Sequence, residues 1–204
     1  MDGVLVDSRP VVERTWRRWA ARHGLDADAL LAVAHGRRSR ETIREQAPHL
    51  DLAREVAWLD AAELADVAGI VPVAGAARLL AALPANSWAV YTSCGRELAL
   101  KRLACTGLPA PAVLVASEDV PRGKPAPDGW LLAASGLGVA IGDCLVVEDA
   151  PPGIAAALAA GTQVLALTTT HAAQRLGGAA RIVEDLAGVT PVLSSGALAG
   201  LSVA

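Results

Sequence analysis

From Pro72 to the C-terminal region, short apolar segments alternate with helical patterns. This alternation constrains the fold more strongly than any other feature of the sequence. From Pro72 onward, strands are expected near 87–91, 112–115, 144–147, 163–167 and 181–183. Helices are expected between them, over 74–83, 96–105, up to about 135, and 153–160. Strands separated by helices are typical of a parallel sheet that is covered on both faces. The sequence therefore predicts an α/β fold built on a doubly wound parallel sheet.

The segment before Pro72 contains helical patterns and no convincing strand. Val12, Trp16 and Trp19 recur at helical spacing after Ser8 and Pro10. Further helices are expected over roughly 26–34, 40–47 and 52–67. We therefore predict a helical insertion over residues 10–71 and an α/β core from residues 1–9 and 72–204. The tail beyond Pro191 is rich in Ala, Gly and Ser, and we expect it to be loosely held.

Charge and apolar runs exclude several classes of partner. The chain has 204 residues and a net charge of −3, which gives no basic surface for nucleic acid. No apolar run is long enough to span a membrane, and Asp2 and Asp7 stand where a signal peptide would need basic residues. The three cysteines are odd in number and widely spaced, which favours reduced thiols. We expect a cytoplasmic monomer that binds neither nucleic acid nor a membrane.

Polar residues follow several of the expected strands. Thr92 and Ser93 come after 87–91, Lys124 lies in a loop rich in Pro and Gly, and Glu148 and Asp149 come after 144–147. In an open parallel sheet, ligands bind at the carboxyl ends of the strands, so these side chains are expected at one edge. A hydroxyl and a lysine suit a phosphate, and paired carboxylates suit Mg²⁺.

Each of these residues also has a structural interpretation when it is taken alone. Taken alone, Asp2-Gly3 is more typical of a surface turn, and Thr92 of an ordinary β-branched residue at a strand end. Lys124 reads as a solvated lysine, and Asp149 as the N-cap of the next helix. The order of the motifs along the chain, more than any one residue, favours the functional interpretation.

The motifs in sequence resemble the haloacid dehalogenase superfamily of phosphohydrolases. They are Asp-Gly-Val-Leu-Val-Asp-Ser at the N-terminus, Thr-Ser at 92–93, Gly-Lys-Pro-Ala-Pro-Asp at 123–128, and Val-Val-Glu-Asp-Ala-Pro-Pro-Gly-Ile at 146–154. The chain is most similar to the branch of sugar phosphatases and β-phosphoglucomutase, which carry a helical cap after the first motif. The resemblance covers Met1 to about Ile182 and implies a Rossmann-like core with an inserted α-helical cap.

The resemblance implies a role for each matching residue. Asp2 matches the aspartate that protonates the leaving oxygen and then activates water, and its backbone carbonyl is also a metal ligand. Thr92 matches the residue that hydrogen-bonds the phosphoryl oxygens, and Lys124 the lysine that screens charge. Glu148 and Asp149 match the acidic pair around Mg²⁺, with Asp149 a direct ligand and Glu148 a direct or water-mediated one.

The substrate contacts are predicted from the same comparison of motifs. Gly3 lets the backbone turn beside the substrate, and Ser93 opens a helix that can cradle a phosphate oxygen. Arg37 and Arg40 lie in the cap loop, where the family reads the leaving group, so they are candidates for holding a phosphorylated sugar or polyol. A solvated run of charges is the competing interpretation of these two arginines.

The first motif departs from the family pattern. The family has Asp-x-Asp-Gly, in which the first aspartate attacks phosphorus, and here Met1 occupies the variable position. The nucleophile and the central strand that precedes it are therefore missing. We expect Met1 to be internal, with the working protein beginning further upstream, and the chain as written to be catalytically crippled.

The sequence thus predicts a Mg²⁺-dependent phosphatase that acts on a small phosphorylated sugar or polyol through an aspartyl-phosphate. A phosphosugar mutase of the β-phosphoglucomutase type is the alternative enzyme. A catalytically inactive phosphate-binding remnant is the alternative outside enzymes, and the coding sequence upstream of Met1 would distinguish it.

Overall fold

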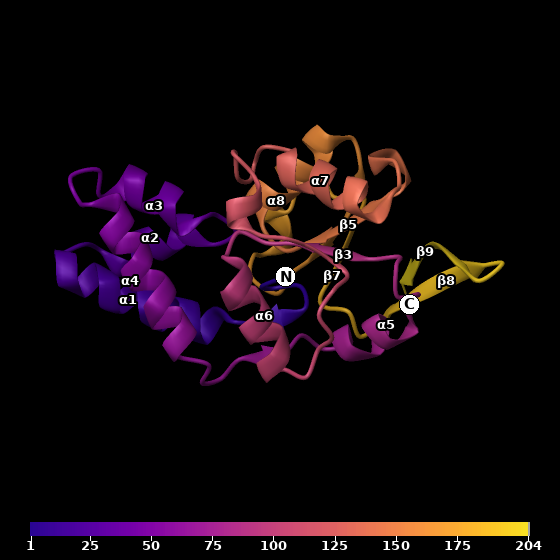
Figure 1. The fold of residues 1–204 in the computed structure, drawn as a ribbon, viewed down its shortest axis with the longest axis horizontal. Helices are drawn as coiled ribbons and strands as arrows, with labels where there is room; N and C mark the ends of the chain where they lie inside the picture. Colours follow the sequence, from indigo (N-terminus) through magenta and orange to yellow (C-terminus); the bar gives the residue numbers. More distant parts are fainter. Residues whose placement is uncertain (204) are drawn as a thin grey trace.

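The structure is a computed structural model that describes residues 1–203. Four helices form one lobe: α1 (Arg9–His23), α2 (Ala27–Ala34), α3 (Ser39–Gln46) and α4 (Leu52–Ala65). They pack around their own apolar cluster, in which Trp16, Trp19, Ile43 and Leu59 are buried. Figure 1 shows this lobe set apart from the rest of the chain, and we call it the cap below. The four helices lie close to the predicted ranges, because the apolar spacing of each one points into the shared cluster.

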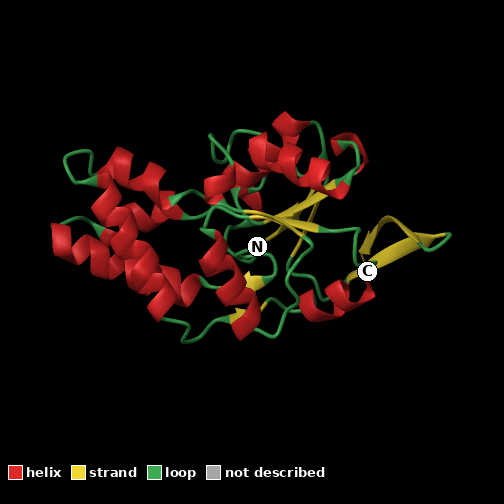
Figure 2. Cartoon of the chain, in the orientation of Figure 1, coloured by secondary structure: helices red, strands yellow, loops and turns green. Residues whose placement is uncertain are grey.

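The second lobe is the α/β core. Strands β3 (Ala89–Tyr91) and β4 (Val113–Val115) pair in parallel, and so do β5 (Leu145–Glu148), β6 (Gln163–Leu167) and β7 (Arg181–Val183). The intervening helices are α5 (Ala76–Ala82), α6 (Arg96–Cys105), α7 (Asp128–Leu137) and α8 (Pro151–Ala160). Figure 2 shows helices on both sides of the strands. The predicted α/β fold with parallel strands is confirmed.

Three short turns of 3₁₀ helix complete the connections of the core, at Ser117–Asp119, Ile141–Asp143 and Ala173–Arg175. The main apolar cluster of the core includes Leu79, Leu103, Leu167 and Leu186, all at most 5% exposed. Met1 joins this cluster, and its carbonyl accepts hydrogen bonds from the N–H groups of Val4, Leu5 and Val6. The start of the described chain is thus packed inside the core, where Figure 1 marks it near the centre of the view.

The connection between the lobes contains a feature that the sequence did not predict. Strand β1 (Val6–Asp7) pairs antiparallel with β2 (Val71–Pro72), so the two chain segments that join the cap to the core run side by side. Each strand has only two residues, too few for a period-2 pattern to stand out. The pairing fixes where both connections leave the core.

The C-terminal tail corrects a prediction. We expected it to be loosely held, but β8 (Val189–Ser194) and β9 (Ala197–Val203) form an antiparallel hairpin. Its turn is Ser195-Gly196, with positive φ at both residues, as two-residue hairpin turns require. Val189 is buried, and Leu201 and Val203 pack against the core cluster. The high content of small residues concealed a strand whose apolar positions still alternate.

Among the described residues, no helix combines the length and the apolar character needed to cross a membrane.

Candidate active site

A cavity between the cap and the core holds the predicted site residues. Nine residues singled out from the sequence line it: Asp2, Gly3, Arg37, Arg40, Thr92, Ser93, Lys124, Glu148 and Asp149. Thr92, Ser93 and Asp149 meet there because they follow β3 and β5, strands of parallel ladders whose carboxyl ends face the same edge. The cap contributes its α2–α3 loop and one side of α4. The roles of these residues stay predictions, but the fold places them together.

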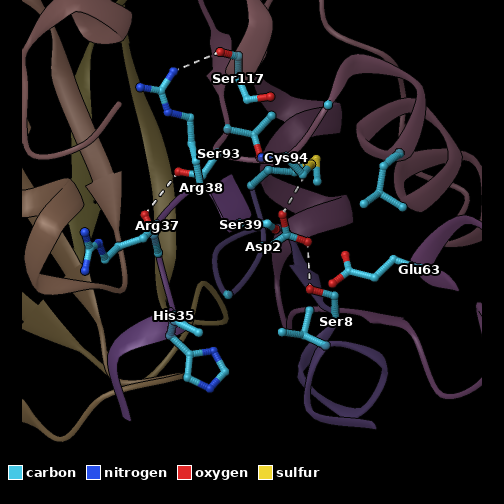
Figure 3. A pocket seen from close by; sticks show the side chains of 18 of the residues that line it. Asp2, Ser8, His35, Arg37, Arg38, Ser39, Glu63, Ser93, Cys94 and Ser117 are labelled. Atoms are coloured by element: carbon cyan, nitrogen blue, oxygen red, sulfur yellow. Dashed lines mark hydrogen bonds between the residues drawn. The ribbon is translucent and has the colours of Figure 1, made fainter. Parts of the chain in front are cut away.

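Asp2 is held through one of its two carboxylate oxygens. The Ser8 hydroxyl donates to Oδ1 at 2.7 Å, and Nη1 of Arg102 donates to the same oxygen at 2.8 Å. Among the described residues, Oδ2 has only the Cys94 thiol as a hydrogen-bond partner, at 3.9 Å (Figure 3). Burial raises the pKa of the Asp2 carboxyl, but the Arg102 guanidinium, the Met1 amino group and the Ser8 hydroxyl outweigh it, so the pKa is below its ordinary value.

Lys124 and Glu148 form a buried ion pair. The lysine is 5% exposed and the glutamate 2%, and Nζ donates to Oε1. Nζ also lies 5.1 Å from the centre of the Tyr91 ring and 5.3 Å from that of Trp130. Burial would lower the pKa of Lys124, but Glu148 raises it above its ordinary value. Burial likewise opposes ionisation of Glu148, and Lys124 nevertheless holds its pKa well below the usual range.

Asp149 is packed against the N-terminal segment. Its Oδ2 accepts a hydrogen bond from the Thr170 hydroxyl at 2.5 Å, and a Cβ placed on Gly3 would overlap the same carboxylate. Only glycine therefore allows the backbone to pass this close to Asp149. Burial, and then the neighbouring charge of Glu148, raise the pKa of Asp149 above its ordinary value. A divalent cation is the kind of partner that would offset this cost of ionisation.

The residues around Asp149 can be compared with the needs of Mg²⁺. The described residues contain no cluster of three or more His, Cys, Asp or Glu side chains suited to a metal ion. Both Glu148 oxygens are engaged, one by Lys124 and the other by the N–H groups of Asp149 and Ala150. Asp149 keeps one oxygen without a hydrogen bond among the described residues. The Asp149 carboxylate is a hard oxygen donor of the kind that Mg²⁺ binds, and its unbonded oxygen leaves one position for such a cation.

Thr92 and Ser93 follow β3 directly. Thr92 is 2% exposed, and its hydroxyl accepts the N–H of Cys94 at 3.3 Å. The Ser93 hydroxyl donates to the carbonyl of Gly36 in the cap loop at 3.1 Å. Burial raises the pKa of the Cys94 thiol to about 12, so this cysteine is a neutral wall of the cavity. Ser93 thus links the core to the cap, besides lining the cavity.

The three arginines between the end of α2 and the first turn of α3 make different contacts. Arg37 forms two hydrogen bonds to Glu45 and points away from Asp2 in Figure 3, whereas Arg40 is exposed. Arg38, which the sequence did not single out, is 6% exposed. Its guanidinium donates to the carbonyls of Ser117, Val120 and Pro121, and pairs with Glu41. The buried arginine of this loop therefore docks the cap onto the core.

Three further residues of the site were missed. Arg102 and Glu63 line the cavity but lie on helices far from the motifs, where nothing in the sequence marks them. Ser8 ends the first motif but was given no role in the site; it is the N-cap of α1 without a side-chain capping bond, and its hydroxyl donates to Asp2 instead. For Ser8, its position only six residues after Asp2 was the one sign in the sequence that it could contact this aspartate.

The fold and this cavity define a class of protein, in which acidic and basic side chains of an α/β core gather under a helical cap. Residues 1–161 match the family described as haloacid dehalogenase-like hydrolase. The chain belongs to this family and is therefore a hydrolase, as its motifs predicted.

Curated relatives and solved structures agree with this assignment. The chain is 40% identical to hexitol phosphatase A of Escherichia coli strain K12 over 195 residues, which are 93% of this chain and 90% of the relative. It is 34% identical to glycerol-1-phosphate phosphohydrolase 2 of Saccharomyces cerevisiae over 183 residues, which are 83% of this chain and 73% of that one. A solved hydrolase from Pseudomonas syringae superposes with a TM-score of 0.82 at 25% identity, covering 91% of both chains.

Proposed function

We propose that the chain is a Mg²⁺-dependent phosphatase that releases phosphate from a small phosphorylated sugar or polyol. The observation that carries the proposal is the arrangement of Asp2, Lys124 and Asp149 around one cavity under the cap. The relatives named as a hexitol phosphatase and a glycerol-1-phosphate phosphohydrolase support the same class of substrate.

Asp2 is the proposed proton donor to the leaving oxygen. Oδ1 is bonded to Ser8 and Arg102, so Oδ2 is the oxygen available to carry a proton toward the substrate. A positioned carboxyl group that gives a proton to the departing alkoxide, and later takes one from water, contributes roughly 10²–10⁴-fold to such a reaction. The attacking carboxylate of the family motif would directly precede Met1 and is not among the residues of this chain.

Lys124 and Thr92 are the proposed phosphate contacts. Nζ of Lys124 is already fixed by Glu148 and two aromatic rings. The side chain therefore loses little further conformational entropy when it binds an anion. Mg²⁺, held by Asp149 and the Asp2 carbonyl, would neutralise phosphoryl charge when bound. Gly3 lets the backbone pass close to Asp149, and the cavity-lining Ser93, Arg37 and Arg40 are the further proposed substrate contacts.

The three cysteines are free thiols in the structure, which fits our proposal that the enzyme acts in the cytoplasm. We propose that it acts as a monomer.

The test is a phosphate-release assay over a panel of hexitol, glycerol and hexose phosphates, with Mg²⁺ and with a chelator. It is run on this chain and on the protein translated in frame from upstream of Met1. Stoichiometric phosphate release that needs Mg²⁺ is expected when an aspartate precedes Met1. Interconversion of two sugar phosphates without net release would identify a mutase, and phosphate binding without turnover in either form would identify a non-catalytic protein.

A further inference from the structure

A buried cation joins the cap to Asp2. Glu63 lies on cap helix α4, and Arg102 lies on core helix α6. Nη2 of Arg102 donates to Oε2 of Glu63 at 2.6 Å, while Nη1 donates to Oδ1 of Asp2 at 2.8 Å. One guanidinium therefore connects a residue of the cap to the proposed proton donor.

The surroundings of Arg102 leave it little freedom. The residue is 2% exposed, and the Glu63 side chain is 9% exposed. Nε of Arg102 is buried without a partner in the described part of the chain, so the two Nη contacts carry the stabilisation of this charge. A buried guanidinium is costly unless charged, hydrogen-bonded partners surround it. Both carboxylates are needed, because either one alone would leave half of the planar fork unpaired.

The contact also fixes which way Asp2 faces. Ser8 and Arg102 both bind Oδ1, so the carboxylate is held through that oxygen and Oδ2 is left beside the Cys94 thiol. Ser8 precedes α1 in the same chain segment as Asp2, whereas Arg102 is held in turn by the cap. If the cap moved away, Glu63 would leave and Arg102 would lose one of its two anchors.

We propose that Arg102 and Glu63 are positioning residues for the hydrolytic reaction, and that Glu63 holds Arg102 in the orientation that fixes Asp2. The proposal rests on the function proposed above. It assigns α4 of the cap a part in the chemistry, because a carboxylate on this helix helps to hold the proton donor in place.

The chain supplies a matched control for this contact. Lys101, adjacent to Arg102, also crosses from α6 to α4, where Nζ donates to the carbonyl of Leu64 at 2.5 Å. Lys101 is exposed and does not line the cavity. K101M therefore removes a contact between the same two helices without touching Asp2.

The kinetic experiment compares E63M, E63Q, R102K and K101M in the form of the enzyme that turns over. E63M should lower kcat at least about tenfold with KM changed less than about threefold, since a misplaced catalytic group costs rate more than binding. E63Q keeps an acceptor of the same length and should retain more activity than E63M. R102K should fall about as far as E63M, because an ammonium group cannot hold both carboxylates in one plane. K101M should stay within about twofold.

The structural experiment distinguishes failure of this inference from failure of the proposed function, because it needs no turnover. Crystal structures of E63M and of the unsubstituted protein are compared for the side-chain rotamer of Asp2. A rotated or disordered Asp2 carboxylate in E63M supports the inference even if no substrate is hydrolysed. An unchanged Asp2 rotamer, or a kcat for E63M equal to that for K101M, would overturn it.

Discussion

Position 3 requires glycine because the Asp149 carboxylate occupies the space that a Cβ would need. Its φ of +70° adds a second requirement for glycine. Gly24, at the end of α1, has nearly the same φ of +65°, but nothing lies within 4 Å of the position of its Cβ. The two glycines therefore separate backbone strain from crowding at the site.

We expect G24A to lower the free energy of unfolding by about 1–2 kcal/mol, the cost of a left-handed conformation for a residue with a Cβ. G3A should cost about 3 kcal/mol or more, because it adds displacement of a buried carboxylate to the same strain. Urea unfolding followed by circular dichroism measures both values. Equal losses in the two variants would show that Gly3 and Asp149 are not packed as described.

The Lys124–Glu148 pair gives a second prediction for single residues. K124M leaves the Glu148 carboxylate buried without its cation, which should lower the free energy of unfolding by about 3–5 kcal/mol. The double variant K124M/E148Q removes the uncompensated charge but keeps an acceptor for the N–H groups of Asp149 and Ala150. It should be more stable than K124M alone. A double variant no more stable than K124M would mean that the pair is not buried as a unit.

Among the elements, the α2–α3 loop carries the docking of the cap. R38M removes the hydrogen bonds to Ser117, Val120 and Pro121, and a loss of only about 1.4 kcal/mol shifts the balance of closed and open forms tenfold. We expect a larger radius of gyration by small-angle X-ray scattering and faster proteolysis near residues 117–123. R40M is the control, because Arg40 is exposed and makes no such contact among the described residues. An unchanged radius of gyration for R38M would show that Arg38 does not hold the cap against the core.

The elements also show what a sequence can predict here. Helices with a clear apolar face and strands between them were predicted within a few residues of their bounds, because their burial is periodic. The β8–β9 hairpin was not, since its apolar residues are diluted by Ala, Gly and Ser. Short motifs identified the side chains that follow strands. Arg102 and Glu63 could not be found this way, because their role arises only where two helices from different lobes meet.

For the whole molecule, the acidic pair should couple metal binding to pH. The pKa of Asp149 is raised from 3.8 to about 8 by folding, so between these pH values the folded protein binds more protons than the unfolded chain. The stability of the metal-free protein therefore falls as the pH rises through this range. A cation needs the ionised carboxylate and competes with that proton. The rise in melting temperature on adding Mg²⁺ should therefore be larger at roughly pH 8 than at roughly pH 5. D149N should abolish this difference, and a stabilisation independent of pH would contradict the assignment of Asp149.

The central claim is that Asp2 gives a proton to the leaving oxygen of a phosphorylated polyol. The most direct test compares D2N with the unsubstituted enzyme on a hexitol phosphate and on p-nitrophenyl phosphate, in the form of the protein that turns over. Because kcat/KM reports the step in which the leaving group departs, D2N should lose roughly 10²–10⁴-fold on the hexitol phosphate. It should lose far less on p-nitrophenyl phosphate, whose leaving group departs without a proton. Equal losses on the two substrates, or no loss on the hexitol phosphate, would contradict the claim.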